Sequence, residues 1–289
     1  MEFVGQLLVN GSVIGVTYVV FALGLTLIFG ILGLINFAHG EFYMLGAYGS
    51  FVLQQQFGLG YITSAITTII FVLILAFIIE KYTISPLIDT DHLNSLLATF
   101  AISIIILNII VIAYGNTPRQ IETPFTGVLA IGDVYITYQR LILIVVGVVI
   151  ILLLNLFIKR SKLGKLMRAV SQNRMGAMVT GIPIKRIYTA TFVLGIGLAT
   201  ISGILIGPIT YATPTMGSSA ILKGFVVVIL GGLGSIPGAI IGGFLLGFGE
   251  TVASVILGNS WKDVVSYLIL IIVLLIKPEG IFGYKRRAQ

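Results

Sequence analysis

Long uninterrupted runs of apolar residues dominate the sequence, and most of them match the length of a helix that crosses a bilayer. A transmembrane helix needs roughly 20 mainly apolar residues. Transmembrane β-strands would instead give segments of about 10 residues in which apolar and polar positions alternate. The pattern therefore predicts helices, with nine candidate spans at 8–35, 38–56, 61–80, 93–114, 141–158, 187–208, 218–233, 237–257 and 264–277.

Two of these nine candidates are weak. The second, 38–56, carries polar residues at membrane depth, and the seventh, 218–233, is short. We expect a hydropathy count to miss one of the two and to report eight spans, and we predict nine crossings.

Composition narrows the class of protein further. Of the 289 residues, 57% are hydrophobic and 9% are charged, and the mean hydropathy is +1.12. An average soluble domain has about 25% charged residues, and its surface needs more polar cover than this chain can supply. Soluble enzymes, nucleic-acid-binding proteins and disordered chains are therefore excluded. We expect an all-α polytopic membrane protein of about eight to nine transmembrane helices, with residues 1–289 in a single transmembrane domain.

Lysine and arginine gather in two regions, and this sets the expected orientation. Residues 159–186 contain eight of them and no Asp or Glu, and the C-terminal tail contains four. Cytoplasmic loops carry an excess of Lys and Arg, so we place both regions in the cytoplasm. Nine crossings then put the N-terminus outside. Thirteen of the 17 basic residues lie inside in this arrangement, and those left outside are Arg119, Arg140, Lys223 and Lys262.

The first interruption of the apolar pattern places an amide, an imidazole and a carboxylate within six residues, at Asn36, His39 and Glu41. Ionisable groups at membrane depth are costly and usually face a cavity or a partner. If the chain breaks at Gly40, His39 and Glu41 could line one polar pocket on a transport path. Alternatively, the segment is a short cytoplasmic turn, and Glu41 stabilises the start of the next helix through the macrodipole.

The second interruption is rich in glycine and contains one proline. It breaks a helix, and freed backbone groups are tolerated at membrane depth only inside protein or along a wet cavity. No G-x-x-x-x-G-K-[ST] nucleotide loop occurs in the chain. In the expected topology both interruptions lie at the inner side, in opposite halves of the chain, and paired interruptions are typical of translocation sites. The second interruption contributes Gly231, Gly232, Gly234, Ser235 and Pro237 as candidate path residues.

Glycines four residues apart recur in the second half of the chain, at Gly203/Gly207, Gly238/Gly242 and Gly243/Gly247. Small residues at this spacing let two helices approach closely. We interpret these pairs as helix-packing positions.

The basic segment predicts a helix from Lys162 to Thr180. Its apolar residues repeat at the i, i+3, i+4, i+7 spacing of one helix face, and Gly181 followed by Pro183 is a typical C-terminal stop. Such a helix could rest on anionic lipid or dock a cytoplasmic partner, and periodicity alone does not choose between them. The residues of the apolar face are Leu163, Leu166, Met167 and Val170.

Two other polar features lie near the outer side. Glu250 falls in the outer half of its helix, where it either lines a path or is satisfied by a neighbouring helix. Ser260 with Asp263 fits a capping box before the last apolar run. We find no metal-ligand spacing and no nucleophile–base pattern, so we expect no metal site and no catalysis in this chain.

The chain resembles a known family over nearly its whole length, and three stretches of its sequence are the most specific part of that resemblance. The chain resembles the permease subunits of branched-chain amino acid ABC transporters. The resemblance implies a type II-like ABC importer fold with broken helices and a translocation path for branched-chain, aliphatic amino acids. The stretches are Gly24-Leu25-Thr26 through Ile35-Asn36-Phe37-Ala38-His39-Gly40-Glu41, then Leu230-Gly231-Gly232-Leu233-Gly234-Ser235-Ile236-Pro237-Gly238-Ala239, then Lys262-Asp263-Val264-Val265-Ser266.

The loop at 159–186 is similar to the family's coupling helix, which implies that it seats in a groove of an ATP-binding subunit. The matching positions are Arg168, Ala169, Asn173, Ala177, Gly181 and Ile182. One departure is Arg174, where relatives often carry an acidic residue. The Gln172-Asn173-Arg174 run is similar to urea and amide permeases of the same superfamily, which leaves that substrate class open.

The resemblance also implies partners: a second, related permease, two cytoplasmic ATP-binding subunits and an extracytoplasmic solute-binding protein, in a bacterial or archaeal inner membrane. ATP and Mg²⁺ would be bound by the partner subunits, and no cofactor is expected in this chain. An ion-coupled secondary transporter is the competing class, although embedded acids are scarce, and Glu41 and Glu250 are the main candidates.

Overall fold

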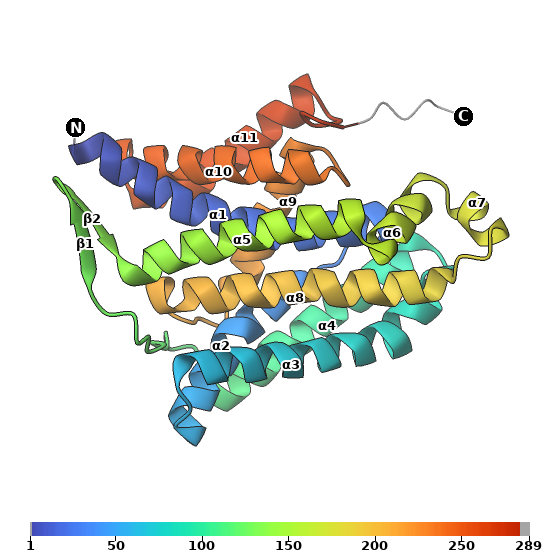
Figure 1. The fold of residues 1–289 in the computed structure, drawn as a ribbon, viewed down its shortest axis with the longest axis horizontal. Helices are drawn as coiled ribbons and strands as arrows, with labels where there is room; N and C mark the ends of the chain where they lie inside the picture. Colours follow the sequence, from blue (N-terminus) through green and yellow to red (C-terminus); the bar gives the residue numbers. More distant parts are fainter. Residues whose placement is uncertain (1, 284–289) are drawn as a thin grey trace.

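The computed structural model describes residues 2–283, which form a bundle of mostly long helices (Figure 1). The described part contains eleven α-helices and one two-stranded hairpin. The elements are α1 (Glu2–Leu32), α2 (His39–Phe57), α3 (Tyr61–Ile79), α4 (His92–Tyr114), β1 (Val128–Ile131), β2 (Val134–Thr137), α5 (Tyr138–Arg160), α6 (Lys162–Gln172), α7 (Arg174–Val179), α8 (Ile184–Thr210), α9 (Met216–Gly231), α10 (Ile236–Ile256) and α11 (Lys262–Ile276).

Each of the nine predicted spans is a helix, but hydropathy alone identifies seven of them as long and apolar enough to cross a membrane. The prediction that a hydropathy count would report eight spans was therefore wrong. Both weak candidates are missed, because neither is at once long enough and apolar enough. α9 is too short at 16 residues. α2 is long enough at 19 residues, but its histidine, glutamate and three glutamines lower its hydropathy.

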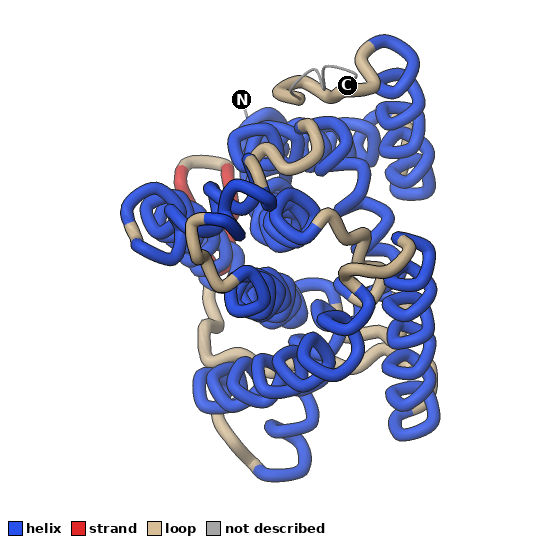
Figure 2. The backbone as a smooth tube through the Cα atoms, turned by 90° about the vertical axis from the view of Figure 1, so that its right-hand side faces the viewer, coloured by secondary structure: helices blue, strands red, loops and turns tan. Residues whose placement is uncertain are grey.

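The helices are arranged around α1 and α8, which are the most buried spans at 72% each. α1 packs against α10, α5 and α9, and α8 packs against α2 and α3. Viewed along the bundle, several helices appear end-on, with others inclined at the edge (Figure 2). α4 and α11 lie at the periphery, with 17% and 6% of their spans buried, and their outward apolar side chains suit contact with lipid.

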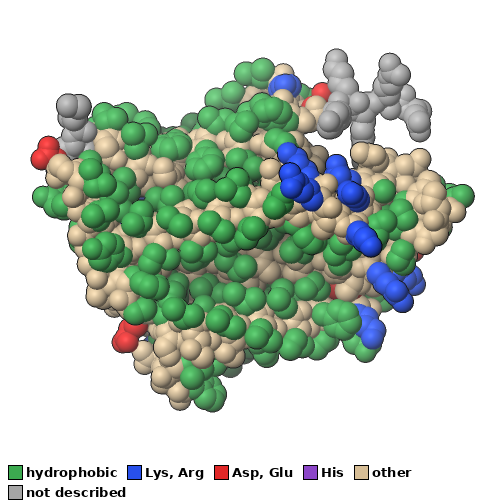
Figure 3. All heavy atoms as spheres, viewed as in Figure 1, with side chains coloured by type: hydrophobic (Ala, Val, Ile, Leu, Met, Phe, Trp, Pro, Cys, Tyr) green, Lys and Arg blue, Asp and Glu red, His purple; other side chains and the backbone are tan. Residues whose placement is uncertain are grey.

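The two ends of the bundle differ. The start of α1 and the β1–β2 hairpin lie at one end, and α6 and α7 lie at the other (Figure 1). Lys and Arg side chains gather at the α6–α7 end (Figure 3). β1 and β2 pair antiparallel, with Val128 opposite Thr137. We did not anticipate this hairpin from the sequence.

The glycine pairs are packing positions, as predicted. A Cβ atom placed on Gly247 would lie 2.5 Å from the backbone of Gly15, so α10 touches α1 there without intervening side chains. A Cβ atom on Gly203 would lie still closer, 1.9 Å from the carbonyl oxygen of Tyr43, so α8 packs directly against α2 there.

The connection from α1 to α2 corrects the expected position of the first interruption. Residues 33–38 run back along α1, so that α2 begins beside its interior rather than at its end: His39 Nε2 lies 3.2 Å from the Phe21 carbonyl oxygen. Phe21 precedes the last residue of α1, Leu32, by eleven positions, about 16 Å of helix. The segment is therefore not a cytoplasmic turn, and α2 starts inside the bundle.

Candidate functional site

The start of α2 contributes a buried carboxylate. Glu41 is 1% exposed, and Ser103 of α4 donates a hydrogen bond of 3.1 Å to its Oε1 atom. Its Oε2 atom has no hydrogen-bond partner. A Cβ atom on Gly217 would lie 2.7 Å from the Gly40 carbonyl oxygen and 2.8 Å from Glu41 Oε2. The two glycines thus bring the start of α9 directly against Glu41.

The three polar residues of the first interruption do not share one pocket. α2 already begins at His39, so the chain does not break at Gly40, and residues two apart on a helix point in different directions. His39 faces α1, whereas Glu41 faces α4 and α9. Asn36 lies on an apolar cleft of about 190 Å³, and neither its Oδ1 nor its Nδ2 has a partner. The hypothesis of a shared pocket for His39 and Glu41 was wrong.

The second interruption is the compact turn between α9 and α10. Gly232 and Gly234 have φ values of 100° and 80°, which a residue with a side chain rarely adopts. Ser235 caps α10, because its Oγ accepts a hydrogen bond of 3.1 Å from the Gly238 amide. Pro237 occupies the first turn of α10.

This turn is packed against other backbone. The Phe282 amide donates to the Gly231 carbonyl at 3.0 Å, and a Cβ atom on Gly234 would lie 3.2 Å from Gly30 near the end of α1. The second interruption therefore lies at the C-terminal end of α1, at the end of the bundle that carries α6 and α7 (Figure 1). The first does not lie at the same depth, so the two do not form one site.

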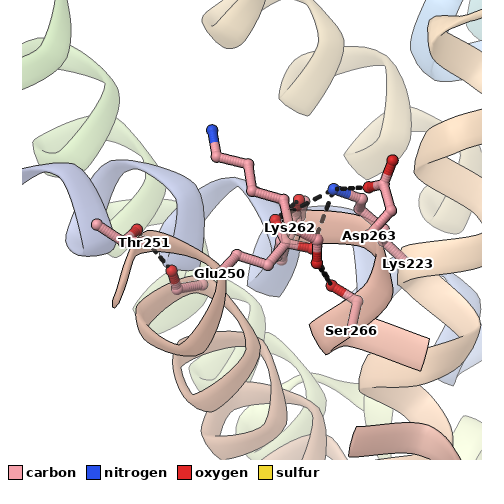
Figure 4. Close-up of polar contacts among 8 residues, drawn as sticks. Lys223, Glu250, Thr251, Lys262, Asp263 and Ser266 are labelled. Carbon is pink, nitrogen blue, oxygen red and sulfur yellow. Dashed lines mark hydrogen bonds and ion pairs between the residues drawn. The ribbon is translucent and has the colours of Figure 1, made fainter. Parts of the chain in front are cut away.

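Glu250 of α10 stands at the centre of an ionic cluster that includes Lys223, Asp263 and Ser266 (Figure 4) and also joins α1 through Tyr18. The carboxylate is 1% exposed. Tyr18 of α1 donates to it at 2.6 Å, Ser266 of α11 also donates, and Lys223 of α9 lies 2.9 Å away. The Lys223 ammonium also contacts the Asp263 carboxylate at 3.0 Å. The sequence left two interpretations of Glu250 open: a residue that lines a path, or a carboxylate whose hydrogen bonds and charge are satisfied by neighbouring helices. The second describes these contacts.

The predicted capping box was wrong. Ser260 belongs to a short 3-10 turn, and α11 begins after Trp261 without a side-chain cap. The Asp263 carboxylate is turned to Lys223 instead. Sequence reasoning singled out the stretch from Lys262 to Ser266 but missed Lys223 and Tyr18. A lone lysine inside an apolar span was the available signal, because such residues usually have a charged partner.

Polar side chains are exposed at membrane depth along the face where α9 lies between α4 and α11. Phe37 connects α4 and α9, because its ring makes edge-to-face contacts with Phe100 of α4 and Phe225 of α9. α9 also packs on α11. Exposed polar residues on this face include Ser218 and Ser219 in α9. Hydrocarbon does not solvate such groups, so this face suits contact with protein or water.

The basic segment forms two helices, which corrects the single helix predicted for 162–180. Asn173 ends α6 and caps α7, because its side-chain oxygen accepts a hydrogen bond of 2.8 Å from the Gly176 amide. The predicted apolar face is present, but it packs inward: Met167 and Val170 are 0% and 3% exposed. Gly181 has a φ of 80° and ends the segment as predicted.

The surface that this segment presents outward belongs to α7. Met175, Met178 and Val179 are 70%, 48% and 86% exposed. At the base of α7, Arg174 pairs with Asp89 and lies 5.6 Å from the Tyr188 ring. The hydrogen bond to the Asp89 carboxylate raises the pKa of Arg174 above its ordinary value, so this guanidinium stays charged.

The predicted coupling positions fall on both helices and on the turn that follows. Arg168 is exposed and donates to the Lys159 carbonyl at 3.2 Å, whereas Ala177 is buried. Ala169 and Ile182 are half-buried, and Gly181 is exposed. Exposure at the tip is therefore concentrated on α7 rather than along the whole segment.

Comparison with known proteins gives concordant matches. The family model described as "Branched-chain amino acid transport system / permease component" matches residues 7–274. The chain is 36% identical to the high-affinity branched-chain amino acid transport system permease protein BraD of Pseudomonas aeruginosa and 34% identical to LivH of Escherichia coli, each over 96% of this chain and 95% of the relative. A probable LivH of Methanocaldococcus jannaschii is 30% identical over 92% of this chain and 88% of its own.

One solved structure shares the fold. The chain is similar to a chain of PsaBC from Streptococcus pneumoniae in complex with Fab, with a TM-score of 0.54 and 16% sequence identity. The match covers 96% of this chain and 94% of that chain.

Proposed function

The chain belongs to the permease components of branched-chain amino acid transport systems, and on that premise we propose that it forms the translocation path for branched-chain amino acids in an ATP-driven importer. The observation that carries this proposal is 34–36% identity sustained over 96% of the chain. Such a system contains ATP-binding and solute-binding components besides the permease. ATP and Mg²⁺ would bind to the partner ATPases, and this chain would need no cofactor of its own.

We place the path on the face between α4 and α11. A zwitterion is expensive to move into hydrocarbon, so the path needs polar side chains at membrane depth. Glu41, Ser218 and Ser219 supply them where α2 meets α9. A second, related permease subunit that covers this face would shield these groups from lipid and complete the path.

The α6–α7 end would face the cytoplasm and the N-terminus the outside. This orientation agrees with the gathering of Lys and Arg at that end (Figure 3), because cytoplasmic loops are enriched in both. The solute-binding protein would then dock at the end that carries the β1–β2 hairpin.

α7 would be the contact for an ATP-binding subunit. Its support is the exposed apolar tip formed by Met175, Met178 and Val179. The apolar face of α6 cannot serve, because the protein's own helices already cover it. A resting place on lipid is less suited to α7, which projects beyond the bundle (Figure 1).

The test is transport by the complete complex in proteoliposomes, with partner ATPases and binding protein present. We expect leucine uptake that depends on ATP. Uptake driven by an ion gradient without the ATPases would identify a secondary transporter instead. Uptake of urea or a short amide, with none of leucine, would move the chain to the amide class of the same superfamily.

A further inference from the structure

A cleft near the outer end of the bundle has a lining suited to a small polar solute. It measures about 260 Å³, slightly below the range of roughly 300–1,000 Å³ that is usual for drug-sized ligands. Its walls come from α1, α2, α8 and α9. The lining includes Tyr18, Tyr43, Tyr211, Ser219 and Lys223.

Lys223 is the one charged residue in that lining. Its ammonium contacts two carboxylates of very different character. Glu250 is 1% exposed and is held by Tyr18 and Ser266 as well, so it is fixed in place. Asp263 has a side chain that is 66% exposed, and among the described residues its carboxylate contacts only Lys223.

Because Asp263 is exposed and Glu250 is buried, another carboxylate can replace Asp263, but not Glu250, as a partner of Lys223. An exposed ion pair contributes little stability, because water solvates both groups nearly as well when they separate. A carboxylate that arrives in the cleft can therefore take the place of Asp263 on Lys223 without changing the charge of the buried pair. Asp263, once displaced, offers its own negative charge to an ammonium group.

The backbone at the rim of the cleft supports a functional role. Tyr211, at the end of α8, has a φ of 66° and is the only non-glycine residue with a positive φ in the described part of the chain. A bulky residue in this conformation is strained, and such strain concentrates at ligand-binding and switch sites. It is held in place by the next residue, since Ala212 exchanges two backbone hydrogen bonds of 2.8 Å with Arg119.

We propose that this cleft is a transient site for the α-carboxylate of the permeating amino acid, which binds Lys223 in place of Asp263. The proposal rests on the proposed function and deepens it, because it specifies a zwitterion rather than a neutral amide. The ammonium of the solute then pairs with the released Asp263, and the aromatic and hydroxyl walls receive the remainder of the molecule.

Labelling of a single cysteine tests binding at the site directly. The chain has no native cysteine, and Ser219 is exposed and lines the cleft, so Ser219→Cys introduces one thiol in the assembled complex. We expect leucine at twice its dissociation constant or more to slow maleimide labelling at least about threefold, because two-thirds of the sites or more are then occupied. Leucinamide, which lacks the carboxylate, should leave the rate unchanged. Equal protection by both compounds, or by neither, would overturn the proposal.

Transport variants test whether the site is used. Lys223→Met combined with Glu250→Gln removes the cation without leaving an unpaired buried charge. We expect leucine uptake to fall at least about tenfold, which is the loss of one charge-assisted contact. Lys262→Met is the matched control, since that ammonium points away from the cluster (Figure 4), and it should transport like the wild type.

If the double variant fails to assemble, Asp263→Asn decides the question alone, because it leaves the buried pair intact. We expect it to reduce leucine uptake severalfold, and Asp263→Glu to retain it. Wild-type uptake by Asp263→Asn would refute the exchange. A wild-type complex that does not transport leucine at all would instead refute the proposed function, so the two failures are distinguishable.

Discussion

Replacement of Gly247 by alanine tests how closely α1 and α10 must pack. The added Cβ atom would lie 2.5 Å from Gly15 of α1, whereas an ordinary contact needs about 3.4 Å. The obstacle is backbone, which cannot rotate away, so the two helices must separate by about 0.9 Å. Overpacking of this kind costs about 1–3 kcal/mol. Alanine also gains about 1 kcal/mol over glycine in a helix interior, so the net loss is about 0–2 kcal/mol.

Gly249→Ala is a matched control on the same helix, because its new Cβ atom meets only the end of the Ile269 side chain at 3.4 Å. This variant should keep the helix-propensity gain without the overlap. The two variants should therefore differ by about 1–3 kcal/mol, or about 2–12 °C in thermal midpoint at roughly 2–4 °C per kcal/mol.

The separation should also be visible in the ionic cluster. Tyr18 and Glu250 each follow the contacting glycine by three residues, so a shift of about 0.9 Å would stretch their 2.6 Å hydrogen bond close to its limit. The assay is thermal unfolding of the purified complex in detergent, read alongside leucine uptake. Equal midpoints for the two variants would refute the close-packing argument.

Four further outcomes are expected. With impermeant reagent on intact cells, Thr126→Cys should be labelled and Ser171→Cys should not, and the reverse pattern would invert the proposed orientation. Glu41→Ala should reduce uptake in an assembled complex while Glu41→Gln is milder, and wild-type uptake by the alanine variant would remove Glu41 from the path. Glu250→Ala should lower stability by about 1.5–3 kcal/mol because it removes the buried partner of Lys223 and leaves only the exposed Asp263 beside that ammonium; denaturation of the complex measures this, and a loss below 1 kcal/mol would contradict it. Val179→Asp should release the ATPase, since a carboxylate in an apolar groove is poorly solvated, and full co-purification would rule out α7 as the contact.

The sequence was sufficient to predict the helices at the nine candidate spans, including the two that a hydropathy count misses. Apolar runs long enough to cross a bilayer make helix formation nearly obligatory, because every backbone group must be satisfied within its own segment. The apolar stripe through Met167 and Val170, the stop at Gly181 and the close-packing glycines are local patterns as well. Their consequences follow from neighbouring residues and from helix geometry, so they could be predicted without the fold.

Tertiary structure decided what each break and each charge does. Residues 33–38 run back along α1 because of contacts between distant residues, such as His39 with Phe21. The local pattern of apolar and polar residues does not reveal such contacts. The helix break at Asn173 arises from a cap, and a capping residue in an amphipathic segment is compatible with one helix or two. Glu250 and Tyr18 are 232 residues apart in the chain. Only the packing of four helices brings such groups within hydrogen-bonding distance, because side-chain pairing depends on position in space and not on separation along the chain.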